Sequence, residues 1–156
     1  MTASSVNYRS RTVRALVMLH EQHLRAFAEV WKEAKARDVQ LPAAPEDAYR
    51  SLDHLLFHVL DSAQGYLVRM CLHLGRPAPQ TAPTPGPEVI ASELSSTLNS
   101  LLDDWRVRLA DVQDSDLEPE IYTPGMHYWI DAMLEHAVMH PVRHAFQLQE
   151  LMDPPR

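Results

Sequence analysis

The chain has 156 residues, of which 46% are apolar and 22% are charged, proportions that are ordinary for one globular domain. Its 14 basic residues stand against 21 acidic ones, so the formal net charge is −7. A nucleic-acid binder needs a basic surface that neutralises phosphates, and the acidic balance argues against that class. We find no apolar stretch of the roughly 18 residues that a membrane span needs, and we expect no membrane partner.

The first residues and the single cysteine favour a cytoplasmic protein. Residues 1–11 lack the apolar segment of a secretory signal. Cys71 is the only cysteine, so it cannot form an internal disulfide, and we expect it to be a small buried residue near the end of a helix. A reducing compartment suits such a chain.

Four segments repeat apolar side chains at intervals of three and four residues, which is the spacing of an amphipathic helix. The predicted helices cover about residues 6–37, 45–74, 87–113 and 124–152. Pro45 and Pro87, each followed by an acidic residue, predict the starts of the second and third helices. Thr123 and Pro124 predict the start of the fourth helix, and Gly75 predicts the end of the second.

These helices predict an all-α fold, a four-helix bundle that forms a single domain over residues 1–156. No segment alternates polar and apolar residues with a period of two, so we expect no sheet. Residues 76–87 contain five prolines and cannot be helical. At roughly 3 Å per residue, this extended segment spans about 35 Å, the length of a bundle helix, and can connect opposite ends of the bundle.

The last predicted helix places His136, His140 and His144 at steps of four, so their side chains stack along one helical face. Measured from the centre of the apolar stripe, His144 lies roughly 60° away, His140 about 100° and His136 about 140°. We therefore expect the first two to border the interior and the third to turn toward solvent. Imidazole is a common metal ligand, but a histidine at a core edge can equally be a hydrogen-bonded packing residue.

Several known bundle chemistries do not fit the spacing. No glutamate is followed three residues later by histidine, as a ferritin-like carboxylate site requires. One cysteine cannot attach a c-type haem, and Ala137 and Pro141 stand where a zincin would have its glutamate base. What remains is a mononuclear site made of His140, His144 and one residue from a facing helix. Three histidines leave a coordination position for water or a substrate atom.

The residues alone leave the third ligand open among His58, His54, His20 and His136. Helical periodicity puts His58 and His54 to the side of the apolar stripe in the second helix, where they would be flank or surface residues. His20 lies on the apolar face of the first helix, where a packing role is the simpler interpretation.

Three segments resemble the DinB/YfiT-like superfamily of metal-dependent bundle proteins. HAVMHPVRHAFQ, residues 136–147, looks like the histidine-rich last helix of that family, with a glutamine three residues after the last histidine. LLFHVLDSAQGYL, residues 55–67, looks like its second helix and has His58 in the ligand position. WRVRLADVQDSDL, residues 105–117, is similar to the approach to its fourth helix.

The resemblance implies an up-down-down-up bundle, commonly a homodimer, that binds a divalent ion such as zinc or nickel through His58, His140 and His144. It also implies an enzyme that acts on a small-molecule substrate, in which the metal activates a low-molecular-weight thiol or water, as in a thiol S-transferase or a hydrolase. It names no catalytic residue. The alternative is a non-catalytic, stress-related protein that binds a metal or small ligand. Pro141 departs from the family pattern, and a proline inside a helix predicts a kink at the site. If His58 is not the third ligand, His54 is the alternative in the same helix.

Overall fold

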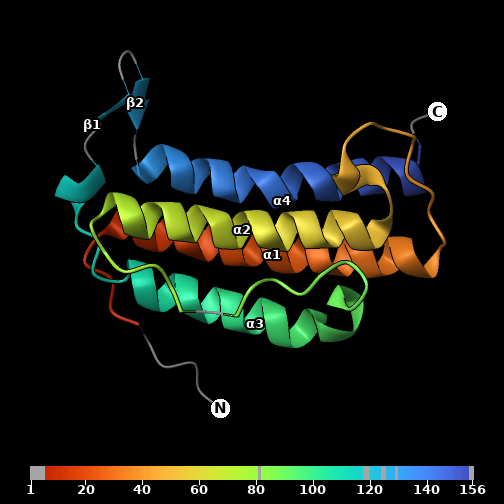
Figure 1. Ribbon diagram of the computed structural model, residues 1–156, viewed down its shortest axis with the longest axis horizontal. Coiled ribbons are helices and arrows are strands. Elements are labelled where there is room, and N and C mark those ends of the chain that lie inside the picture. The colour runs from red at the N-terminus through yellow and green to blue at the C-terminus, as the bar shows by residue number, and fades with distance from the viewer. Residues whose placement is uncertain (1–5, 81, 118–119, 124–125, 129, 155–156) are drawn as a thin grey trace.

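Four α-helices packed side by side make up most of the molecule (Figure 1). The computed structural model describes residues 6–80, 82–117, 120–123, 126–128 and 130–154. The helices are α1 (Arg11–Ala36), α2 (Leu52–His73), α3 (Ile90–Leu109) and α4 (Ile130–Met152). The all-α bundle predicted from apolar periodicity is confirmed.

The helices run in the up-down-down-up order, because α1 and α4 point one way and α2 and α3 point the other (Figure 1). Two parallel consecutive helices need a long connection, and the segment between α2 and α3 runs back along the bundle as predicted. The side chain of Gln64, in α2, forms hydrogen bonds that hold this connecting segment against the helix. Its Nε2 donates to the carbonyl of Ala82 at 3.1 Å, and its Oε1 accepts from the hydroxyl of Thr84 at 2.7 Å.

The start of α2 is set by a capping serine. Ser51 Oγ accepts a hydrogen bond from the backbone N–H of His54 at 3.2 Å, so α2 begins at Leu52 rather than at Pro45 as predicted. The acidic residues after Pro45 form only a short 3-10 turn, η1 (Asp47–Tyr49). This turn lies directly before α2 and contacts it.

The predicted end of α2 at Gly75 is confirmed. Gly75 has a φ of +67°, a left-handed conformation that glycine adopts without steric cost. Its N–H donates to the carbonyl of Leu72 at 3.0 Å, and the N–H of Arg76 donates to that of Cys71 at 2.8 Å. These two bonds satisfy carbonyls at the helix end in the Schellman arrangement. Cys71 is buried near the helix end, as expected.

The other helices are also shorter than predicted, and the expectation of no sheet is wrong. Residues 120–123 (β1) pair antiparallel with residues 126–128 (β2), so α4 begins only at Ile130. Thr123 therefore lies in β1 and caps no helix, whereas Pro124 lies outside the described residues. The run of β-branched and aromatic residues at 121–123 favours an extended backbone but is too short to show a period. α3 ends at Leu109, before the 3-10 turn η2 (Asp114–Leu117).

Ser10 explains where α1 begins and ties that end of the helix to η2. Its Oγ accepts from the N–H of Val13 at 3.2 Å and donates to the carboxylate of Asp114 at 2.5 Å. The hydroxyl thus caps the helix and bridges segments far apart in the sequence, and it is fully buried.

Two tryptophans connect α1 and α3 to α2 through the core. The indole N–H of Trp31 in α1 donates to the carbonyl of Leu52 at 2.7 Å. The indole N–H of Trp105 in α3 donates to the carbonyl of Ala63 at 3.2 Å. Both rings are buried among the apolar residues of the four helices, so each combines burial with a satisfied polar group.

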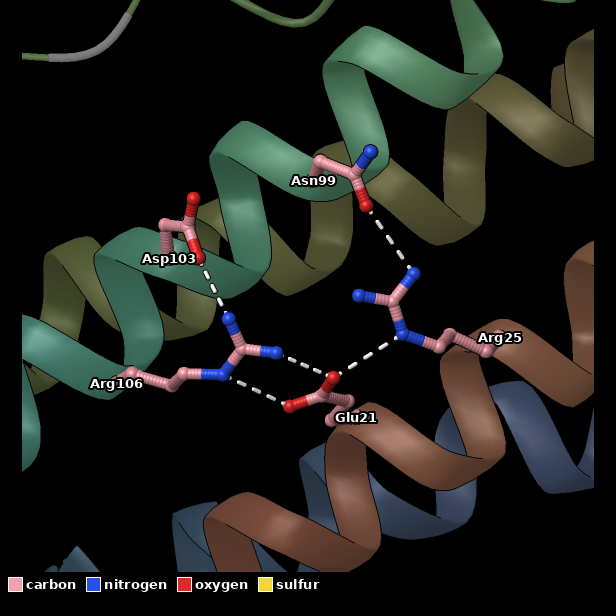
Figure 2. A network of polar contacts seen from close by, with 5 residues as sticks. All are labelled: Glu21, Arg25, Asn99, Asp103 and Arg106. Carbon is pink, nitrogen blue, oxygen red and sulfur yellow. Dashed lines mark hydrogen bonds and ion pairs between the residues drawn. The ribbon is translucent and has the colours of Figure 1, made fainter. Parts of the chain in front are cut away.

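A polar network joins α1 to α3 at the surface (Figure 2). The carboxylate of Glu21 accepts from both Arg25 and Arg106, and these arginines also bind Asn99 at 3.1 Å and Asp103 at 2.6 Å, respectively. Burial alone would raise the pKa of Glu21, but the hydrogen bonds from Arg106 and Arg25 outweigh it and the pKa is lowered. Glu21 therefore stays charged and holds the two helices in register.

His20 is buried in the core, and no described residue gives it a polar partner. Its ring stacks on that of Trp105 with 3.8 Å between centroids. Neither ring nitrogen has a hydrogen-bond partner in the part of the chain that the structure describes. Burial lowers the pKa of His20 to about 3, so the folded protein holds the neutral ring.

This burial predicts a loss of stability in acid. The unfolded chain protonates His20 near pH 6.5, whereas the folded chain resists protonation down to about pH 3. The stability that the neutral ring contributes is complete above pH 6.5 and falls as the pH drops toward 3. His20→Phe keeps a stacked ring that cannot be protonated. Its free energy of unfolding should exceed that of the wild type by a margin that grows by up to about 1.4 kcal/mol per pH unit below pH 6.

Urea unfolding of both proteins at pH 7, 6 and 5, with chelator present, measures this margin. A margin that does not change with pH would contradict the assignment of a neutral, buried His20.

Candidate metal centre

Three histidines meet where α2 packs against α4. One ring nitrogen from each of His58, His140 and His144 lies within 4.8 Å of the other two. His58 comes from the first half of α2, and the other two come from successive turns of α4. The helix continues through Pro141, so the proline does not separate the pair, and the two ring centroids lie 4.8 Å apart.

The burial of the histidines on α4 follows the predicted order. His144 is 1% exposed and His140 is 6% exposed, whereas His136 lies at the surface. Burial lowers the pKa of His140 to about 3, and the neighbouring imidazoles of His144 and His58 lower it further. Burial also lowers the pKa of His144 to about 4 and lowers that of His58. The three rings are therefore neutral near pH 7, which is the form that binds a metal.

The spacing of two of these rings suits ligands of one ion. Nε2 of His58 lies 3.1 Å from Nε2 of His140. Two nitrogens that bind one tetrahedral zinc ion at about 2.05 Å lie about 3.3 Å apart. Without an ion, the same distance allows a hydrogen bond from one neutral ring to the other. The pair is thus already at ligand spacing.

The third ring has a nitrogen that only an additional group could satisfy. Nδ1 of His144 lies 2.8 Å from Oε1 of Gln147, and an amide oxygen can only accept, so Nδ1 carries the proton. The lone pair of His144 is then on Nε2, which is buried and has no hydrogen-bond partner among the residues described. Burying an unsatisfied polar atom is costly, and a cation next to Nε2 would remove that cost. The residues present fit a metal ion.

A cavity, called the access cavity below, borders the cluster at His58. Its volume is about 350 Å³, and His58 forms part of its wall. The cavity is also lined by Asp47, Ala48, His54, Phe57, Asp61 and Pro87. A small molecule in this cavity would lie against His58.

The sequence model of the DinB family matches residues 37–153, which include α2, α3 and α4. The chain belongs to the DinB family. No curated protein and no solved structure matches it. The match includes all three histidines of the cluster, so the resemblance predicted from short motifs is confirmed at the level of the family. Among the described residues of this DinB chain, no helix has the length and apolar character needed to span a bilayer.

Periodicity alone placed His58 outside the core stripe of α2, and only the DinB resemblance gave it a ligand position. The reason lies in the packing, because α2 contacts both α3 and α4. A side chain on the flank of the stripe can therefore face a neighbouring helix instead of solvent. His58 is partly buried against α4 in this way.

The three other candidate histidines of the DinB chain lie outside the cluster. Nδ1 of His54 lies 2.8 Å from the hydroxyl of Ser51 at the start of α2. Nε2 of His136 lies 3.1 Å from the hydroxyl of Tyr66. His20 stacks on Trp105, as described above.

Sequence reasoning did not place two tyrosines beside the cluster, and one of them, Tyr66, has its ring centroid 5.9 Å from that of His140. Tyr49, in η1, has its ring centroid 6.1 Å from that of His144. It precedes α2 in a segment without helical periodicity, so no pattern could have placed it near α4.

The geometry predicts which substitutions abolish metal binding in the DinB chain. His58→Ala, His140→Ala and His144→Ala should each lower zinc affinity by more than the roughly 10–100-fold that loss of an outer-shell partner causes. Competition with a chromophoric chelator on untagged protein measures the affinity. His54→Ala and His136→Ala are matched controls that should stay within about threefold of the wild type, since neither ring is in the cluster.

Circular dichroism should show unchanged helicity in all five variants. Zinc content that persists in His140→Ala and His144→Ala would contradict a site at these residues.

Proposed function

We propose that this DinB protein is a divalent-metal-dependent enzyme in which His58, His140 and His144 hold the ion. The observation that supports this most strongly is the buried Nε2 of His144, which has no hydrogen-bond partner among the described residues and belongs to a cluster of three neutral imidazoles. We propose a reaction of the thiol S-transferase or hydrolase type.

The residues of the chain have separate roles in this proposal. Three protein ligands leave at least one coordination position open. Held by the three histidines, the ion would lower the pKa of a thiol or water that takes the open position. Gln147 fixes the tautomer of His144, so that Nε2 keeps its lone pair. His58 lies on the wall of the access cavity, which gives a substrate a route to the cluster.

The ligand set favours zinc or nickel. Imidazole nitrogens suit such borderline ions, whereas magnesium and calcium prefer carboxylate and carbonyl oxygens. The cluster found among the described residues contains no carboxylate. A soft sulfur ligand is compatible with either metal, which supports a low-molecular-weight thiol as the second component.

The wall of the access cavity favours a substrate with positive charge or hydrogen-bond donors. Asp47, His54 and Asp61 contribute polar side chains to it, and two of them are acidic. Such a wall attracts an ammonium group and repels an anion. Small thiols that carry an amino group meet this condition.

A second candidate is a non-catalytic bundle that binds a metal or a small ligand. It is favoured by the composition of the cluster, which, over the part of the chain described, has three imidazoles and no acidic residue that could serve as a general base. The two candidates share the metal site and differ only in turnover.

Turnover assays separate them. Zinc- and nickel-loaded protein is mixed with cysteamine, a cationic thiol that suits the acidic wall, or with glutathione, bacillithiol or mycothiol, and with monochlorobimane. Transfer forms a carbon–sulfur bond, releases chloride and passes the thiol proton to solvent. A parallel assay follows hydrolysis of p-nitrophenyl acetate. We expect at least one combination to exceed the rate of His140→Ala, treated with the same metal, by about tenfold or more, because the variant lacks a ligand.

No turnover by metal-loaded wild type in any combination would overturn the enzyme proposal and favour the second candidate. Failure to take up metal at all would remove the enzyme proposal and the metal-binding form of the second candidate.

A further inference from the structure

A second, apolar cavity is lined by Gln147 and Tyr49, two neighbours of His144. Its volume is about 320 Å³. Leu41, Pro42, Ala44, Leu55, Leu148 and Leu151 form its apolar lining. These residues come from the loop before η1, from α2 and from the end of α4, so the cavity is built by three separate segments. The volume is within the range of small-molecule sites.

Two residues connect this cavity to the candidate metal centre. Tyr49 and Gln147 both line it. The ring of Tyr49 lies 6.1 Å from that of His144, and Oε1 of Gln147 accepts the proton of His144 Nδ1. A molecule in the cavity would therefore lie against the residues that support His144.

Gln147 supplies hydrogen-bond donors at the apolar wall. Because its Oε1 is bound to His144, its amide nitrogen is directed to the other side of the amide group. That Nε2 bonds to none of the described residues and is open to solvent. A ligand oxygen can therefore accept from Nε2 without disturbing the bond to His144.

Charge decides the class of ligand. Glu150 is the one charged residue among those that line the cavity, and it is exposed. Its carboxylate repels an anion, and the leucine walls would strip water from a cation without replacing it. A neutral molecule avoids both costs.

We propose that this cavity binds a small neutral molecule with an aryl or alkyl body and one carbonyl oxygen, which accepts a hydrogen bond from Gln147 Nε2. Binding needs no metal, so the inference goes beyond the proposed function and stands apart from it.

The test uses prodan, a neutral naphthalene ketone whose fluorescence shifts to the blue in apolar surroundings, and the matched 2-dimethylaminonaphthalene, which lacks the ketone. Both are titrated into metal-free protein in chelator. Wild type should saturate with prodan and prefer it over the second probe by at least about fivefold, the net effect of one hydrogen bond. Gln147→Leu should abolish that preference.

A pair of leucines in the last turns of two helices provides the control. Leu151→Asp places a charge in the cavity lining and should weaken both probes by at least about tenfold. Leu72→Asp changes an equally placed, exposed leucine of α2 outside the cavity and should leave both affinities unchanged.

Three results would each overturn the proposal: no saturable prodan binding, equal effects of Leu151→Asp and Leu72→Asp, or a preference for prodan that survives in Gln147→Leu. Since the titration contains no metal, a failure of the metal site would leave this outcome unaffected.

Discussion

Packing of α2 against α4 brings Nε2 of His58 within 3.1 Å of Nε2 of His140, although 82 positions separate the two residues in the chain. The chemistry of the candidate metal centre depends on this contact. It removes the imidazoles from water, which lowers their pKa values and keeps the rings neutral near pH 7. It also leaves Nε2 of His144 buried and unpaired among the described residues. An unpaired buried nitrogen destabilises the fold, and an apolar side chain at this position would avoid that loss.

Two buried histidines with unpaired nitrogens illustrate how surroundings decide function. His20 stacks on Trp105, and among the described residues no other imidazole ring contacts it. His144 instead lies beside two other neutral rings and is oriented by Gln147. The same unsatisfied atom is therefore a stability cost in the first case and a candidate ligand in the second. Burial alone would not distinguish them.

Much of the fold could be predicted from the sequence, because the apolar stripes repeat over many turns and Gly75 has the conformation that ends a helix. The residues at which the helices begin were harder to predict. Ser51 caps α2 through one hydrogen bond, and that bond outweighs the acidic turn after Pro45. The short hairpin after η2 has too few residues to show a period. These features depend on single contacts, which periodicity cannot reveal.

Two of the three histidines of the candidate metal centre could be predicted from spacing, and the third could not. His140 and His144 lie on one helix, so their spacing alone indicates that they are neighbours. His58 comes from another helix, and its position depends on how α2 turns its flank toward α4. Helical periodicity describes one helix at a time, so only the resemblance to a known family could supply His58. Tyr49, in a turn, had no signal of either kind.

The most direct test is anomalous diffraction at the zinc edge from crystals of untagged protein grown with zinc. The account predicts an anomalous peak between α2 and α4, about 2.0–2.1 Å from one ring nitrogen each of His58, His140 and His144. A peak at His54 or His136 with none at the cluster, or rings of His58 and His144 that point apart in the zinc-containing crystal, would contradict it.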